Sequence, residues 1–174
     1  MQPHGRQPGA ALQAIALSAL AQVAEHIATA TIDRMRKNLH RPHAPCPCDS
    51  GESYGQCCGP WHADVDGGNG APTPEALMRS RYSAYVLGQI DYLLVTWHPS
   101  TAPGDLELPP IKWLGLEVLH AQASSDAGVV EFVARHRSAR GATRMHEISR
   151  FVREGERWYY VDGQIMQSDP DTVG

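Results

Sequence analysis

The organisation of this chain is decided by residues 44–59, which read Ala44-Pro45-Cys46-Pro47-Cys48-Asp49-Ser50-Gly51-Glu52-Ser53-Tyr54-Gly55-Gln56-Cys57-Cys58-Gly59. All four cysteines of the protein lie in this stretch, two separated by one proline and two adjacent. The residues before it differ in composition from those after it. The cluster therefore divides a leader, residues 1–44, from a longer globular part.

Four cysteines this close together favour a metal site. Zinc prefers thiolate ligands in a closed tetrahedron, with Zn–S distances of about 2.3 Å. Pro47 restricts the chain between the first two cysteines and Ser50-Gly51 provides a turn, so one short segment can supply all ligands. Buried or free thiols and a redox site are the alternatives, but the Cys-x-x-Cys redox spacing is absent. We expect a structural Zn²⁺, with no coordination position left for a substrate, held by Cys46, Cys48, Cys57 and Cys58.

Composition and charge describe a globular protein. The 174 residues are 42% hydrophobic and 20% charged with a net charge of −4, which excludes a disordered or nucleic-acid-coating protein. Residues 1–44 carry five basic and two acidic side chains, a net charge of +3, so the remainder carries −7. We expect Lys37 and Arg41, which lie just before the cysteines, to offset the charge of a zinc tetrathiolate.

Neither a membrane span nor a signal peptide is predicted. Polar residues interrupt the alanine-rich segment, so no apolar run approaches the length of about 18 residues that a span needs. The leader also lacks the basic start, the purely apolar core and the cleavage site that make up a signal peptide. We expect a cytoplasmic protein, and in that reducing compartment clustered cysteines are more often metal ligands than disulfides.

The leader has helical periodicity between Ala10 and Asn38. Apolar residues recur there at spacings of three and four, from Leu12 to Ile27, which places them on one helical face. Met35 is an alternative start of the protein. Two interpretations therefore stay open, a dispensable helix or over-extended reading frame, and an amphipathic helix that binds a partner.

Two helices are predicted after a glycine-rich linker, residues 64–72. Thr73 is suited to cap the first helix, Pro74 to occupy its first position and Gly88 to end it. The second helix is predicted to begin at Asp91 and to contain residues 92–97, before a proline stops it. Residues 99–110 contain four prolines and are predicted to be a loop.

The rest of the chain is predicted to be strand. Residues 111–119, 129–137, 146–153 and 156–161 are rich in β-branched and aromatic residues. A two-residue turn at Glu154-Gly155 predicts three pairs on one face of the last hairpin, namely Phe151 with Trp158, Ser149 with Tyr160, and Glu147 with Asp162. Helices followed by antiparallel strands predict an α+β domain whose helices cover one sheet face.

The cysteine stretch resembles the SEC-C motif, a zinc knuckle with the pattern Cys-Pro-Cys-Gly-Ser-Gly, then several residues, then Cys-Cys or Cys-His. The resemblance assigns the metal to the same four cysteines. The chain departs from the pattern in having Asp49 for the usual glycine. It also has Glu52, Ser53 and Gln56 where lysines are common, which puts the choice of partner in doubt.

The whole region from Pro45 to Gly163 resembles the bacterial YchJ-like family of uncharacterised proteins. The strings that carry the resemblance are Leu77-Met78-Arg79-Ser80-Arg81-Tyr82-Ser83-Ala84-Tyr85, Asp91-Tyr92-Leu93, Thr96-Trp97-His98-Pro99, Trp113-Leu114-Gly115-Leu116, Phe132-Val133-Ala134-Arg135, Ser149-Arg150-Phe151 and Trp158-Tyr159-Tyr160-Val161-Asp162-Gly163. It implies a knuckle at residues 45–63, a nuclear-transport-factor-2-like (cystatin-like) domain at 73–165, with a curved antiparallel sheet packed on helices, and a tail at 166–174.

Folds of this shape hold a cavity between the sheet and the helices. The polar and aromatic residues expected to line it are Arg81, Tyr82, Tyr85, Trp97, His98, Glu147, Ser149, Trp158, Tyr160 and Asp162. Glu147, Asp162 or His98 could serve as an acid or base there. The alternative is structural: His98 caps a helix, and the carboxylates pair with Arg81 or Arg150.

These features lead to competing functions. The first is a zinc-binding adaptor, whose knuckle docks a protein or ribosome-associated partner while the α+β domain serves as scaffold or small-ligand pocket. The alternative is an enzyme that acts on a small apolar or phenolic molecule, which we favour less because motifs such as a phosphate-binding glycine loop are absent. Nucleic-acid contact through residues 34–41 is a weaker option. The resemblance also allows a homodimer that pairs through the outer faces of the sheets.

Overall fold

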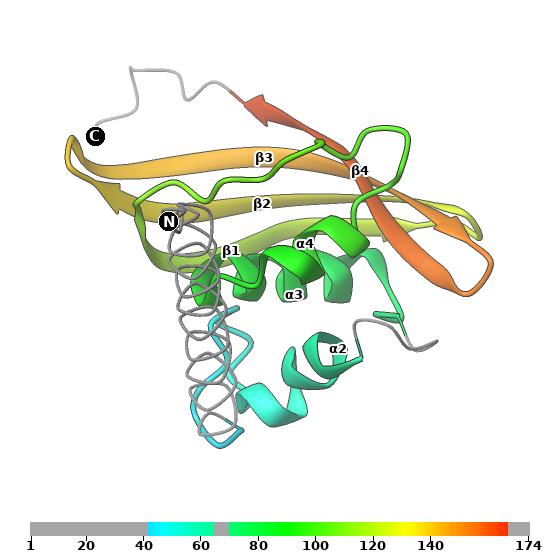
Figure 1. Cartoon of the computed structure of the whole chain (residues 1–174), viewed down its shortest axis with the longest axis horizontal. Coiled ribbons are helices and arrows are strands. Elements are labelled where there is room, and N and C mark those ends of the chain that lie inside the picture. The colour runs from blue at the N-terminus through cyan, green and yellow to red at the C-terminus, as the bar shows by residue number, and fades with distance from the viewer. Residues whose placement is uncertain (1–41, 65–69, 167–174) are drawn as a thin grey trace, which may run out of the picture. The chain divides into compact units, whose positions relative to one another are not determined.

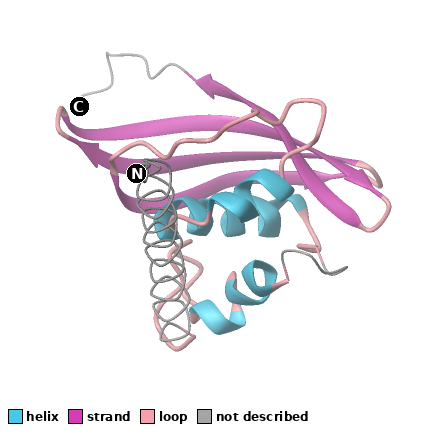
Figure 2. Ribbon diagram, viewed as in Figure 1, coloured by secondary structure: helices cyan, strands magenta, loops and turns pink. Residues whose placement is uncertain are grey.

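A computed structural model describes residues 42–64 and 70–166 (Figure 1). In these ranges four strands form one sheet, and the helices lie on one side of it (Figure 2). The predicted leader helix, part of the glycine-rich linker and residues 167–174 of the tail lie outside the described residues. The predicted α+β class, a curved antiparallel sheet packed on helices, is confirmed.

The first long helix begins and ends where its capping residues predict. Helix α3 spans Pro74–Leu87, and the Thr73 side chain accepts a hydrogen bond from the amide of Ala76 at 3.1 Å. Gly88 follows it with a φ of 69°, a left-handed conformation that glycine adopts without steric cost. Two shorter elements precede α3, the 3₁₀ turn η1 at Tyr54–Gln56 and helix α2 at Gly59–Ala63.

Helix α4 is shorter than predicted. It spans Ile90–Val95, so Trp97 lies beyond its end. Trp97 instead forms an isolated parallel bridge with Tyr160 of the last strand, flanked by hydrogen bonds from the Tyr160 amide to the Thr96 carbonyl and from the His98 amide to the Tyr160 carbonyl. The backbone around Trp97 therefore pairs with the edge strand β4 and does not continue the helix.

The strands are longer than predicted and follow one another across the sheet. They are β1 (Lys112–Ala123), β2 (Ala127–Ser138), β3 (Gly141–Glu154) and β4 (Arg157–Met166), in the order β1-β2-β3-β4 with every pair antiparallel. Helix α3 packs against β1, β2 and β4. The sheet and α3 therefore form the two layers of the domain.

The predicted register of the β3–β4 hairpin is wrong. Phe151 pairs with Tyr160 rather than Trp158, because the two-residue loop consists of Gly155 and Glu156. Gly155 has a φ of 61°, as the first position of some hairpin loops requires. A bulge in β4, opposite the step between Arg150 and Phe151, then shifts the register again, so Asp162 pairs with Arg150. Asp162 and Glu147 therefore lie on opposite faces of the sheet.

One hydrophobic core joins the cysteine stretch to the sheet. The same cluster of buried residues contains Cys46, Cys48 and Cys58 together with Leu77 of α3 and Phe151 of β3. Helix α3 lies between them and is buried on most sides. The described residues of the knuckle and of the sheet domain belong to one compact unit, so the two parts share a core.

Gly128 provides a test of how α3 meets the sheet. A β-carbon at this position of β2 would clash with the ring of Pro74, which cannot rotate away. We expect Gly128→Ala to lower the free energy of unfolding by about 1–3 kcal/mol, measured by urea denaturation. Gly104→Ala is the matched control, because nothing lies within 4 Å of its β-carbon. Equal stability of the two variants would contradict this packing.

Candidate functional site

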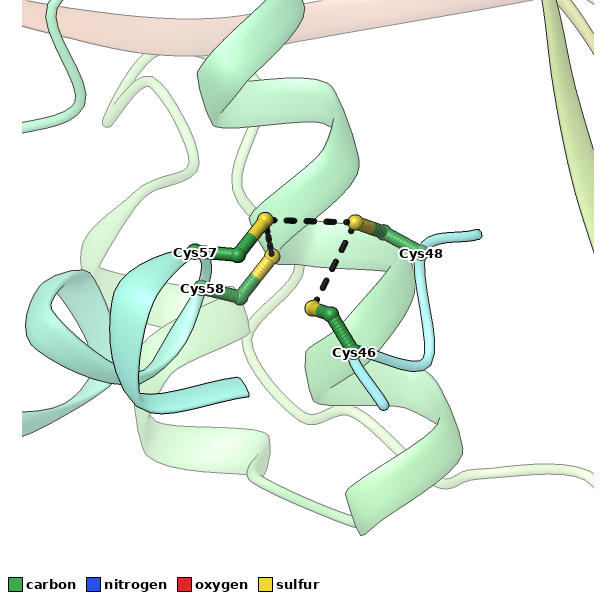
Figure 3. A group of neighbouring side chains, drawn as sticks. All are labelled: Cys46, Cys48, Cys57 and Cys58. Carbon is green, nitrogen blue, oxygen red and sulfur yellow. Dashed lines mark hydrogen bonds between the residues drawn. The ribbon is translucent and has the colours of Figure 1, made fainter. Parts of the chain in front are cut away.

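The four cysteine sulfurs converge on one point (Figure 3). Their Sγ atoms all lie within 4.8 Å of one another, and neighbouring pairs are separated by 3.4 Å (Cys46–Cys48), 3.5 Å (Cys48–Cys57) and 3.8 Å (Cys57–Cys58). A tetrahedron with Zn–S bonds of about 2.3 Å has edges of about 3.8 Å. No disulfide joins these cysteines. The donor set and its spacing therefore fit a tetrahedral thiolate-bound metal.

Local turns place the sulfurs. The amide of Cys46 donates to the Glu52 carbonyl at 2.8 Å, and the amide of Asp49 donates to the Cys46 carbonyl at 3.2 Å, which closes a tight loop around the first two ligands. Gly51 has a φ of 85° in that loop. The chain then passes through η1, which delivers Cys57 and Cys58 to the start of α2.

The thiols share their protons within the cluster. Hydrogen bonding to Cys48 lowers the pKa of Cys46, whereas desolvation raises the pKa of Cys57 to about 11. A metal cation binds thiolates, so it must release the protons that such a buried cluster retains. Metal affinity of the site should therefore increase with pH.

Helix α3 supplies the polar contacts behind the cluster. Ser83, which is fully buried, donates a hydrogen bond to Cys58 Sγ at 3.3 Å and lies 3.7 Å from Cys46 Sγ. Arg79, one helical turn earlier, donates from Nη1 to the Cys48 carbonyl at 3.1 Å. Sequence reasoning missed both residues, although their i, i+4 spacing places them on one helix face. Lys37 and Arg41, predicted to offset the thiolate charge, lie outside the described residues.

A buried histidine fastens the knuckle to the domain. His62 Nε2 lies 2.8 Å from the Ser80 carbonyl, so it carries the proton and donates, and Nδ1 accepts from the Tyr54 hydroxyl at 2.7 Å. Burial lowers the pKa of His62 to about 4, which keeps the ring neutral at physiological pH. The Ser80 hydroxyl continues the network to Tyr92 of α4 at 2.7 Å. The knuckle is therefore held by directional contacts as well as by apolar packing.

Asp49 explains the departure from the usual SEC-C glycine. Its φ is 56°, in the left-handed region that aspartate tolerates better than most residues. Its carboxylate Oδ2 accepts the amide hydrogen of Leu116 in β1 at 2.9 Å. Asp49 thus provides the conformation needed by the loop and a second attachment of the knuckle to the sheet.

A cavity of about 420 Å³ lies between α3 and the concave face of the sheet. Six of the residues predicted to line it do so, namely Arg81, Tyr82, Tyr85, Glu147, Ser149 and Tyr160. Apolar side chains form most of the remaining wall, including Met78, Ile111, Trp113, Phe132, Ala134, Met145 and Phe151.

The other four predicted pocket residues lie outside this cavity. His98 Nε2 lies 3.1 Å from Glu154, and Asp162 is ion-paired with Arg150 on the opposite sheet face, where the bulge in β4 places it. Trp158 is buried and donates to the Pro72 carbonyl, and the rings of Trp97 and Tyr160 pack edge to face. Of the three proposed acid or base groups, only Glu147 faces the cavity.

Comparison with known proteins identifies both parts. Residues 44–60 match the family model of the SEC-C motif, and residues 73–163 match that described as "YchJ, middle NTF2-like domain". Solved structures of SEC-C motif containing proteins from Rhodopseudomonas palustris (35% identity, 70% of this chain and 98% of that chain) and Psychrobacter arcticus (29%, 74% and 86%) each superpose with a TM-score of 0.61. The fold and the cysteine cluster therefore define a SEC-C motif joined to an NTF2-like domain.

Similarity to curated proteins gives the family. A UPF0225 protein of Bordetella pertussis is 55% identical over 134 residues, which are 75% of this chain and 99% of that protein. A UPF0225 protein of Chromobacterium violaceum is 52% identical over 136 residues, 74% of this chain and 98% of that protein. The chain belongs to the UPF0225, or YchJ, family. Within the described residues, every helix is too short or too polar to cross a membrane.

Substitution of Asp49 tests its two roles separately. Asp49→Ala removes the acceptor for the Leu116 amide and places alanine in a left-handed conformation, so we expect a loss of about 2–3 kcal/mol in the free energy of unfolding. Asp49→Asn retains an oxygen acceptor and tolerance of that conformation, so it should cost less than half as much. Asp105→Ala, in an exposed loop, is the control for urea denaturation. Equal losses for alanine and asparagine would contradict the assignment.

Proposed function

We propose that this protein is a zinc-dependent adaptor of the cytoplasm, in which the SEC-C knuckle docks a protein partner and the NTF2-like domain acts as its scaffold. The observation that carries the proposal is the set of four sulfurs at tetrahedral spacing. Four protein ligands saturate zinc and leave no position for a substrate, so the ion has a structural role. A reducing compartment keeps such cysteines available as ligands.

The exposed surface of the knuckle is the proposed docking surface. Its first turn presents Ser50, Gly51 and Glu52, and η1 presents Gln56, all exposed. The side opposite this surface rests on α3 through Ser83 and Arg79. Because this surface carries a carboxylate and no lysine, we propose a partner with a polar or basic surface.

Metal analysis tests the zinc half of the proposal. We expect about one zinc per chain in the full-length protein after expression in zinc-replete medium, and a large drop in thermal stability when a chelator removes it. Ser83→Ala removes the hydrogen bond to the Cys58 sulfur, so it should weaken zinc binding by about 10–100-fold in a competition titration. Ser125→Ala, in the exposed β1–β2 turn, is the control. Less than about half a zinc per chain would contradict the proposal.

Affinity capture tests the adaptor half. We expect proteins captured by the full chain to be lost with Cys57→Ser/Cys58→Ser, which removes two ligands. They should also be lost with Glu52→Lys/Gln56→Lys, which keeps the ligands and changes only the exposed surface. Zinc content and circular dichroism of the lysine variant show that its fold is intact. Capture that persists in both double variants would contradict docking through the knuckle.

A further inference from the structure

The cavity under α3 contains a buried charge that the knuckle does not use. Arg81 projects from α3 and is only 5% exposed. Its Nη1 donates hydrogen bonds of 2.7 Å to the Leu93 carbonyl and to the Thr96 hydroxyl. Its guanidinium carbon lies 4.5 Å from the ring centre of Tyr160 and 5.0 Å from that of Trp97. One edge of the guanidinium is thus fixed by the protein.

The other edge of Arg81 lacks a protein acceptor. In the described part of the chain, no carboxylate forms an ion pair with it, and Nε and Nη2 donate to no side chain or carbonyl. Desolvation lowers the pKa of Arg81, because the surroundings compensate its charge only in part. Nε and Nη2 are not among the fully buried polar atoms without a partner in the described residues, so they are open to the cavity and can donate to an acceptor from outside the chain. Arg81 lines the cavity, where an acceptor can reach it.

The cavity also holds a carboxylate, that of Glu147, and is lined by His136, whose buried Nδ1 has no partner among the described residues. Oε1 of Glu147 accepts hydrogen bonds from Ser149 at 2.6 Å and, more weakly, from the Tyr160 hydroxyl at 3.5 Å. The carboxylate rests against Gly163 of β4, where any β-carbon would clash with it. It forms no ion pair within the described residues. Glu147 is therefore held in place yet keeps acceptor capacity for a ligand.

We propose that this cavity binds a small monocarboxylic acid with an apolar ring or branched chain, whose carboxylate pairs with the free edge of Arg81 and whose hydroxyl donates to Glu147. Two adjacent N–H groups of a guanidinium match a carboxylate in a bidentate geometry. The apolar wall of Met78, Phe132 and Phe151 suits the body of the ligand. A volume of about 420 Å³ is at the lower end of ligand pockets, which favours a single ring.

Charge in and near the cavity favours a monoanion over other ligands. A cation would meet the buried charge of Arg81, which already occupies the face of the Tyr160 ring. A dianion such as a phosphate would carry more charge than one arginine neutralises, and Glu147 would repel it. An adjoining depression shares Tyr85 and Trp113 with the cavity and contains Lys112, which would attract an anion.

The test is a titration of the full-length, metal-loaded protein with three probes that share a 4-hydroxyphenyl ring and carry an anionic, a neutral or a cationic group opposite the hydroxyl. We expect 4-hydroxybenzoate to bind saturably and about tenfold or more tightly than 4-hydroxybenzamide, with no binding of 4-hydroxybenzylamine. Amide resonances of residues 78–85 and 145–151 should shift in the wild-type protein. No saturable binding of the benzoate, preference for the amine, or shifts confined to other regions would overturn the proposal.

Variants identify the groups responsible. Arg81→Met should weaken binding of 4-hydroxybenzoate by about tenfold or more, whereas Arg150→Met, on the opposite sheet face, should leave it unchanged. Glu147→Gln removes a like charge, so it should strengthen binding of unsubstituted benzoate. If Arg81→Met does not fold, the Glu147→Gln result and the resonance shifts decide the question. Unchanged affinity in a folded Arg81→Met variant, or weaker benzoate binding in Glu147→Gln, would overturn the proposal.

Discussion

The structure depends on the burial of α3 from two sides. The helix has the cysteine knuckle on one side and the sheet on the other, so eight of its residues are buried. Several of these are polar, and a buried polar group is costly unless it is hydrogen-bonded. Ser80 bonds to the Leu77 carbonyl and lies beside the Tyr92 hydroxyl, and Ser83 bonds to a cysteine sulfur. The helix is therefore stable only when both neighbours are present.

This constraint explains why α3 lacks a simple apolar stripe. A helix on a protein surface has one apolar and one polar face. A helix packed between two layers has no continuous polar face exposed to water. Its sequence places Leu77 and Met78 in the core, and Ser83 against the metal site. Arg81 occupies the one position where a charge meets a cavity rather than packed side chains.

Local signals in the sequence predict much of this structure. Thr73 and Gly88 determine the ends of α3 through contacts with their immediate neighbours. The cysteines lie within thirteen positions, so the metal site follows from ligand chemistry and turn residues without knowledge of the fold. β-Branched and aromatic runs predicted the strands, and the YchJ-like resemblance, now established by the match over residues 73–163, added the curvature of the sheet and the cavity.

The sequence-based predictions fail where contacts between distant parts of the chain determine the local structure. The bulge in β4 reverses the face of Asp162, and the only local signal of it among the neighbouring residues is Gly163, because a glycine inside a strand often marks a bulge. Trp97 leaves the helix because the edge of β4 offers it a partner 63 positions later in the chain. The roles of Arg79 and Ser83 likewise depend on the docking of the knuckle. These residues lie 31 and 25 positions from their cysteine partners in the sequence.

The same helix contacts both the cysteine cluster and the cavity. Ser83 contacts the cysteine sulfurs, and Arg81, two residues earlier, faces the cavity. Because only about half a helical turn separates these two residues, loss of a metal from the knuckle would remove support from the helical segment that orients Arg81. Binding of the proposed metal and of the proposed acid would each stabilise the same packed arrangement of α3, and linkage would then make each ligand favour the other by an equal free energy. A knuckle attached by a flexible linker would give no such coupling, whereas this one shares a core with the domain that it adjoins.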